Sequence, residues 1–160
     1  MGAFTLFHVA ISLIGIGSGF VVAFKLLLGK RLPVWTATFL STTVLTSLTG
    51  FMFPVHHFMP SHAIGIVSLI VLALAIYALY VKRLAGAIRN VYAINAVIAL
   101  YLNCFVLIAQ LFQKVPALKA LAPTQTETPF KVAQLIALLV FVVLGIFATR
   151  GFRNEQLRTA

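Results

Sequence analysis

Acidic side chains are almost missing from this sequence. Two of its 160 residues are acidic, and both are glutamates. The chain also has a single cysteine, and it lacks a CxxC motif and a glycine-rich phosphate loop. These absences exclude carboxylate pairs built from aspartate, Ser/His/Asp triads and disulfides within the chain, and they argue against a hydrolase or an ATP-driven pump.

Charged residues of either sign are scarce as well. They make up 9% of the chain, whereas hydrophobic residues make up 62% and the mean hydropathy is +1.10. Such a composition leaves too little polar surface to cover a water-soluble globule, so we predict a polytopic membrane protein.

Five apolar runs approach the roughly 20 residues that a helix needs to cross the hydrocarbon core of a bilayer. The runs leave short connections and no room for a soluble domain. We therefore predict an all-α fold: a single transmembrane domain, residues 1–160, formed by a bundle of five helices. The runs are Thr5–Phe24, Pro33–Phe53, His62–Val81, Val91–Phe112 and Val132–Phe147.

The basic residues are distributed unevenly between the two ends of these runs. Loops rich in lysine and arginine stay in the cytoplasm, so we expect the N-terminus outside and the C-terminus inside a bacterial cytoplasmic (inner) membrane. The net charge of +10 then reflects topology and contact with anionic lipid, and nucleic acid is not an expected partner. The inner residues are Lys25, Lys30, Arg31, Lys82, Arg83, Arg89, Arg150, Arg153 and Arg158, and the outer ones are Lys114, Lys119 and Lys131.

The four histidines are predicted to face one compartment. His8 is near the start of the first run, and His56, His57 and His62 lie between the second and third runs. With the topology above, all four belong to the outer side of the membrane. Imidazole binds haem iron and transition metals, so this outer layer is where we expect any cofactor.

His8 and His62 form the leading pair of candidate ligands. Each lies about one turn from the outer end of its helix, and the two helices run in the same direction. Two imidazoles from separate helices can hold one b-type haem, with His57 as a third candidate ligand. A transition-metal ion such as zinc or copper needs three or four converging nitrogens, which would bring in His57 and His56. Both cofactors stay open, as does the alternative that the histidines only happen to cluster at the membrane surface.

Three of the predicted helices carry small or polar residues along one face. In the first, Gly15 and Gly19 follow His8 on a face that favours close helix packing and turns His8 into the bundle. The second is rich in hydroxyls, which bond the backbone one turn back or reach a neighbouring helix. In the fourth, a polar seam includes Asn95 and Asn103. We expect these groups to join helices rather than to line a conduction path or a ligand cleft.

The outer loop between Lys114 and Lys131 is rich in proline and threonine, so we expect it at the membrane surface. Its Glu127 lies on the histidine side, where it would either orient an imidazole or be solvated. Cys104 lies deep in the fourth run and is predicted to be a small core residue. The residues after Phe147 are expected to form a short, frayed, basic tail.

His8 with its following glycines, and His62 leading into Leu72–Tyr77 and the basic Lys82–Arg83, resemble an uncharacterised family of small bacterial multi-helix membrane proteins. They distantly resemble the helical b-type cytochromes too. The resemblance covers residues 5 to 112. Di-haem cytochromes carry ligands in two layers, whereas the inner layer here has no histidine and Ala87–Asn90 stands in its place. The resemblance therefore implies one haem at most.

Two functional predictions follow from the sequence. The first is an integral membrane protein whose outer histidines hold one haem or one metal ion for electron transfer or sensing. The alternative is a cofactor-free accessory or assembly subunit that packs against a larger membrane complex or against further copies of itself. In both cases we expect a component of a membrane system, surrounded by lipid, rather than a free-standing enzyme.

Overall fold

The computed structural model describes residues 2–53 and 60–159, with side chains described for 2–53 and 62–152. All regular structure in these ranges is helical, which confirms the predicted fold class. The five predicted runs correspond to α1, α2, α3 with η1, α4 and α6. The elements are α1 (Ala3–Leu27), α2 (Pro33–Gly50), α3 (Pro60–Ile76), the π-helical turn η1 (Tyr77–Val81), α4 (Ile88–Lys114), α5 (Pro116–Leu121) and α6 (Thr128–Thr159).

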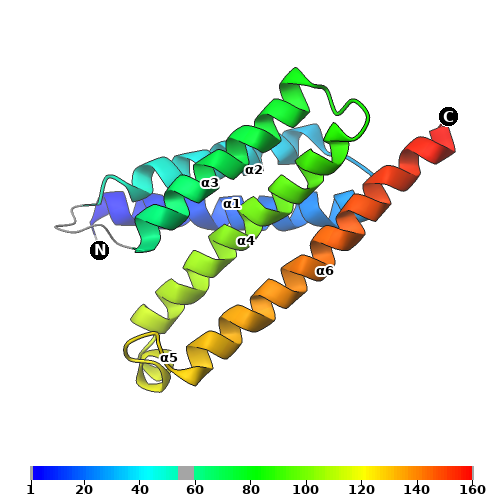
Figure 1. The fold of residues 1–160 in the computed structure, drawn as a ribbon. Coiled ribbons are helices and arrows are strands. Elements are labelled where there is room, and N and C mark those ends of the chain that lie inside the picture. Colours follow the sequence, from blue (N-terminus) through cyan, green and yellow to red (C-terminus); the bar gives the residue numbers. More distant parts are fainter. Residues whose placement is uncertain (1, 54–59, 160) are drawn as a thin grey trace.

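The helices form two antiparallel hairpins with α3 between them. α1 packs along α2, α4 packs along α6, and α3 lies against both α2 and α4 (Figure 1). α1 also touches α4 and α6, so it lies at the centre of the bundle. The N-terminus and the C-terminus are at opposite ends of the molecule (Figure 1).

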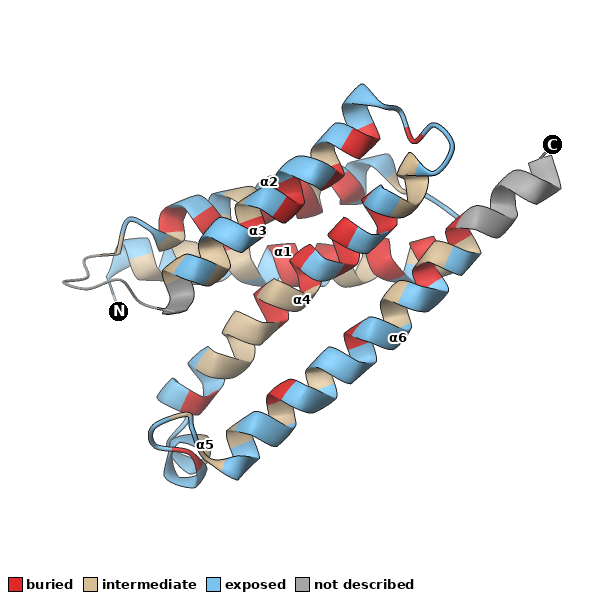
Figure 2. Ribbon diagram, viewed as in Figure 1, coloured by how far each residue is buried: buried red, intermediate tan, exposed pale blue. Residues whose placement is uncertain are grey.

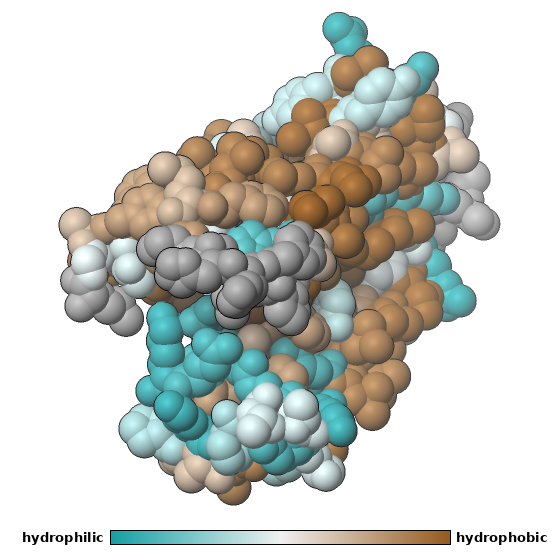
Figure 3. All heavy atoms as spheres, turned by 60° about the vertical axis from the view of Figure 1, so that its left-hand side comes forward, coloured by the Kyte–Doolittle hydropathy of each residue, from teal (hydrophilic) through white to brown (hydrophobic). Residues whose placement is uncertain are grey.

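Four helical segments are long and apolar enough to cross a membrane. They contact lipid through large exposed hydrophobic side chains, so the chain is a multi-pass membrane protein (Figure 3). α2 is long but less apolar, because serine and threonine make up much of it. The four segments are Ala3–Leu27, His62–Val81, Ile88–Lys114 and Thr128–Phe152.

The turn between α1 and α2 follows from its glycine and its proline. Gly29 adopts a φ of 71°, and its N–H donates to Leu26 O while the N–H of Lys30 donates to Lys25 O. This pattern is the Schellman motif, which needs a residue in the left-handed conformation. Pro33 then opens α2 at a position where its missing N–H costs little, as predicted.

The connection between α3 and α4 is less regular. The helix widens into η1, and Arg83 and Leu84 then adopt positive φ values of 49° and 60°. This conformation is unfavourable for side chains with a Cβ. The turn directs Leu84 into the core, where it is 5% exposed, and the burial of its side chain offsets part of that cost.

The small-residue face of α1 is buried at the centre of the bundle, as predicted. A Cβ at Gly19 would lie 2.6 Å from Leu100 Cδ1 of α4 and 2.8 Å from Phe39 Cε2 of α2. Gly15 faces hydroxyl groups of α2 and the amide of Asn103. The glycines therefore let three helices meet, and Figure 2 shows buried residues concentrated where they do.

The hydroxyls of α2 behave as predicted. Most donate to a backbone carbonyl one turn back, and Ser47 also donates to Ser68 of α3 at 3.2 Å.

The two asparagines of the polar seam on α4 make different hydrogen bonds. Asn103 donates from Nδ2 to Thr43 Oγ1 of α2 at 3.2 Å, whereas Asn95 bonds the Val91 carbonyl of its own helix. Asn103 therefore links two helices within the membrane, but Asn95 does not.

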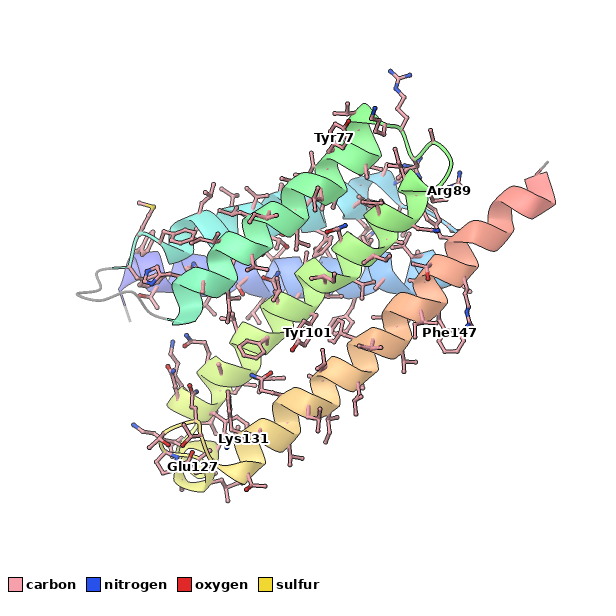
Figure 4. All side chains as sticks on the ribbon, viewed as in Figure 1. Tyr77, Arg89, Tyr101, Glu127, Lys131 and Phe147 are labelled. Carbon is pink, nitrogen blue, oxygen red and sulfur yellow. The ribbon has the colours of Figure 1, made fainter. Side chains whose placement is uncertain are left out.

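At its C-terminal end, α6 continues as a helix to Thr159, so the expectation of a frayed tail after Phe147 was wrong. Arg89 of α4 lies over the ring of Phe152, with its guanidinium carbon 5.0 Å from the ring centroid, and its Nη1 donates to the Phe152 carbonyl. Figure 4 shows Arg89 at the opposite end of the bundle from Glu127 and Lys131. The contact of Arg89 joins α4 to α6 where both leave the apolar core.

Candidate metal centre at the outer histidines

The two described histidines lie on either side of the last turn of α2. His8 is in the second turn of α1, His62 is at the start of α3, and both side chains are half-buried. His56 and His57 lie outside the described residues. Of the four predicted ligands, two can therefore be placed.

A hydrogen bond holds one nitrogen of the His8 ring to α2. His8 Nδ1 lies 2.7 Å from Thr49 Oγ1, and the Thr49 hydroxyl lies 2.7 Å from the carbonyl oxygen of Leu45. A hydroxyl has one proton, so Thr49 either donates it to His8 Nδ1 or donates it to Leu45 and accepts from His8. In the second case Nδ1 carries the proton of the neutral imidazole, and Nε2 carries the lone pair. This is the arrangement found in histidines that bind metals, where a hydrogen bond from one nitrogen orients the other.

The ring of His8 is held in place by its neighbours. Its edge meets the ring of Phe53, with centroids 5.1 Å apart and an interplanar angle of 86°, and Phe53 in turn contacts Phe4. Gly50 leaves room for the imidazole, because a Cβ there would lie 3.9 Å from His8 Cε1. The prediction that His8 turns toward the bundle is confirmed.

His62 packs on a different residue of the same turn. Its ring lies 5.7 Å from the ring of Phe51, at an interplanar angle of 31°. Phe51 reaches this position because Gly65 has no side chain, and a Cβ on Gly65 would lie 2.9 Å from Phe51 Cζ. The small residue one turn below His62 thus determines where the aromatic partner of His62 lies.

The end of α2 separates the two imidazoles. α1 and α3 do not pack along each other in the described ranges, and α2 lies between them (Figure 1). His8 and His62 instead approach the same three-residue stretch, Phe51–Phe53, from two sides. No group of three His, Cys, Asp or Glu side chains that could hold a metal occurs among residues 2–53 and 62–152.

Glu127 is at the exposed surface, as the solvated alternative predicted, and its carboxylate bonds neither of the described histidines. Its carboxylate accepts hydrogen bonds from Thr124 N at 3.1 Å, Thr124 Oγ1 at 2.8 Å and Thr126 N at 3.0 Å. Desolvation raises the pKa of Glu127, but these bonds and one from its own backbone outweigh it, so the pKa lies below the ordinary value. The carboxylate therefore stabilises the turn before α6.

The loop between α4 and α6 is ordered by a second contact that the sequence did not indicate. Gln125, at a φ of 60°, donates from Nε2 to the Ala109 carbonyl of α4 at 2.6 Å. The short helix α5, which begins at Pro116, was not predicted either. Hydrophilic residues gather over this region, away from the hydrophobic surface of the bundle (Figure 3).

The buried thiol of Cys104 lies within α4 in the core, as predicted.

A cavity of about 290 Å³ lies elsewhere, between α4 and α6. Its lining is apolar apart from the hydroxyls of Tyr101 and Thr149, and neither of the two described histidines borders it. It opens among side chains that face lipid, so it does not belong to the histidine end.

The sequence does not connect the chain to a characterised family. No family model matches it, and comparisons with curated proteins and with solved structures give no significant match.

Proposed function

We propose that the outer end of this membrane protein binds a transition-metal ion through Nε2 of His8 and the imidazole of His62, for electron transfer or sensing. His57 and His56 are the further candidate ligands. The observation that carries the proposal is the chain of hydrogen bonds from His8 Nδ1 to Thr49 and on to Leu45. It holds the imidazole in place, and when His8 donates from Nδ1 to Thr49, the lone pair is on Nε2, the nitrogen that has no bond within α2.

A metal ion fits this arrangement better than a haem between the two histidines. Phe53 packs on His8 and Phe51 packs on His62, so a porphyrin held between the imidazoles would have to displace both rings. A single ion needs less space, but it requires nitrogens of both imidazoles to converge although the end of α2 lies between the rings. Neutral imidazole suits zinc, copper, iron and nickel.

The first test is metal binding by the purified protein in detergent. We expect one ion per chain, measured by elemental analysis and by calorimetric titration with Zn²⁺ and with Cu⁺, and we expect His8→Ala to abolish it. Thr49→Val keeps the shape of the side chain but removes the acceptor of the His8 proton. It should weaken binding about 10–100-fold, as loss of such supporting contacts does elsewhere.

Thr46→Val is the matched control. Thr46 lies one turn earlier on α2, and its hydroxyl donates to the Thr42 carbonyl and makes no hydrogen bond to His8. Affinity should not change in this variant. A Soret band that disappears in His8→Ala would show that the site binds a haem rather than a metal ion. If the protein binds neither, the alternative function remains, which is a cofactor-free accessory subunit.

We further propose that α1, α2, α3, α4 and α6 each cross a bacterial inner membrane, with the N-terminus outside. The opposite positions of the two termini and the gathering of cations at one end support this orientation. A reporter fused after Ala160 should be cytoplasmic, and one inserted between Pro123 and Thr128 should be external. Finding both reporters on one side would contradict five crossings.

A further inference from the structure

We propose that the α4–α6 groove, the cavity of about 290 Å³ between these two helices, holds an acyl chain of an anionic phospholipid whose phosphate binds Arg150 and Arg89. The proposal is independent of the metal site, because neither described histidine borders the groove. The groove opens among exposed hydrophobic side chains, so it takes its occupant from the membrane.

The groove is as long as one leaflet of a bilayer is thick. On α6 it is lined from Leu138 to Thr149, and Thr149 lies just before Phe152, where the apolar span ends. The rise from residue 138 to residue 149 of a helix is about 16 Å, and half of a hydrocarbon core of roughly 30 Å is about 15 Å. The groove therefore follows the path of an acyl chain from the headgroup region to the middle of the bilayer.

Two aromatic rings lie near the deep end of the groove. Tyr101, about half-way along α4 (Figure 4), has its ring centroid 5.7 Å from that of Phe141 of α6, and both residues line the groove. At the other end the lining residues are Ile94 of α4 and Thr149 of α6. This second end is at the membrane surface, where a phospholipid has its headgroup.

The rim of the groove suits a narrow chain better than a helix. Membrane helices pack closely where small residues let their backbones approach. Gly145 faces Val97 of α4, because a Cβ there would lie 3.6 Å from Val97 Cγ1, and the exposed residues around it are bulky. A neighbouring helix would be held away by these side chains, whereas an acyl chain can lie between them. The rim residues, from 37% to 49% exposed, are Ile94, Ile98, Leu138, Val142 and Ile146.

Two arginines lie at the surface end of the groove. Arg150 directly follows Thr149 and is exposed. Arg89 bonds the same turn of α6, because its Nη1 donates to the Phe152 carbonyl at 3.4 Å, while its buried Nε has no hydrogen-bond partner within the described residues. The one carboxylate whose side chain is described, Glu127, lies at the opposite end of the bundle (Figure 4).

This charge distribution identifies the headgroup. Guanidinium groups bind phosphate through several N–H donors, and basic residues between helices at a membrane surface attract anionic lipid. Neither Arg150 nor Arg89 has a described carboxylate beside it to neutralise its charge. In the orientation proposed above, the lipid belongs to the cytoplasmic leaflet.

The experiment is native mass spectrometry of the detergent-solubilised full chain with palmitoyl-oleoyl phosphatidylglycerol and with phosphatidylcholine of the same acyl chains. The wild type should bind one phosphatidylglycerol roughly tenfold more tightly than phosphatidylcholine, whose choline cation is repelled by the arginines. Arg150→Gln and Arg89→Gln should each weaken phosphatidylglycerol binding about fivefold and change phosphatidylcholine binding less.

Arg83→Gln is the matched control for charge. Arg83 is an exposed arginine at the same end of the bundle, on the connection between α3 and α4, and it does not line the groove. Its loss should leave the preference for phosphatidylglycerol unchanged. An equal loss of binding in Arg83→Gln and Arg150→Gln would mean a general attraction between charges and would contradict a site at the groove.

A second set of variants tests the acyl chain. Gly145→Leu places a side chain in the groove and should abolish saturable binding of both lipids, whereas Val143→Leu, on the exposed face of α6 outside the lining, should change neither. Circular dichroism in lipid-free detergent checks that each variant is folded. Val142→Phe narrows the groove from its exposed rim and should have the same effect as Gly145→Leu, so the test does not depend on one variant.

Three results would overturn the proposal. The first is equal affinity of the wild type for the two lipids, and the second is wild-type lipid binding in folded Gly145→Leu or Val142→Phe. The third is a dimer of the wild-type protein that Gly145→Leu dissociates, because the groove would then be filled by a second copy of the chain.

Discussion

Gly151→Ala should separate the inner ends of α6 and α1. The Cβ of an alanine at this position would collide with the carbonyl oxygen of Leu27 and would lie 2.7 Å from the Leu27 carbonyl carbon and 3.0 Å from the oxygen of Leu26. These atoms belong to the backbone at the end of α1, so no rotamer change relieves the clash. One of the two helices has to move.

The expected cost is about 1–3 kcal/mol or more, because overpacking a close contact forces the backbone to shift. Thermal unfolding in detergent, followed by circular dichroism, should show a clearly lower midpoint. The matched control is Gly145→Ala on the same helix, where the new Cβ would meet only Val97 Cγ1, at 3.6 Å. Equal stability of the two variants would mean that α6 does not dock on α1 through Gly151.

The sequence predicted the helices well because each feature that defines them is local. Apolar runs and Pro33 at the start of a run act within a few residues, and the structure has them in place. The features it did not predict depend on distant neighbours. The positive φ of Leu84 arises from burial in the core, and the order of the outer loop depends on a bond from Gln125 to α4.

Gln134 in α6 is another residue whose contact could not be predicted from its local sequence. It is one polar residue in an apolar run, and nothing adjacent to it in the sequence indicates its orientation. In the structure it is buried, and its Nε2 donates to the Phe105 carbonyl of α4 at 3.1 Å, which joins α6 to α4. In a bilayer, such a bond gives the side-chain amide N–H a hydrogen-bond acceptor where no water is available.

The candidate site was predictable in part. The position of His8 above a small-residue face indicated that its ring turns inward, and the structure confirms this. Its hydrogen-bond partner was not predicted, because Thr49 is one of many hydroxyls on α2 and the register between two helices is not evident from either one. For the same reason the sequence paired His8 with His62 but did not predict that α2 ends between them. The pairing therefore stays a prediction for the metal-binding experiments.

Gly19→Leu should disrupt the centre of the bundle. Space at Gly19 is taken by Leu100 of α4 and Phe39 of α2, both fully buried, so a leucine side chain has no volume to enter. The side chains of Leu100 and Phe39 can yield to a small group, but a branched chain of four carbons would push α1 away from both helices. We expect a loss of about 1–3 kcal/mol or more in the free energy of unfolding.

Gly17→Leu provides the control from the same helix, two residues away. Gly17 is exposed, and a Cβ added there would meet nothing within 4 Å, so its leucine would extend into lipid and leave the unfolding midpoint unchanged. Because α1 carries His8, displacing it in Gly19→Leu should also lengthen the contact to Thr49 and weaken metal binding, while Gly17→Leu binds as the wild type does. Wild-type stability and binding in Gly19→Leu would place this face of α1 against lipid and remove the structural support for His8 as a ligand.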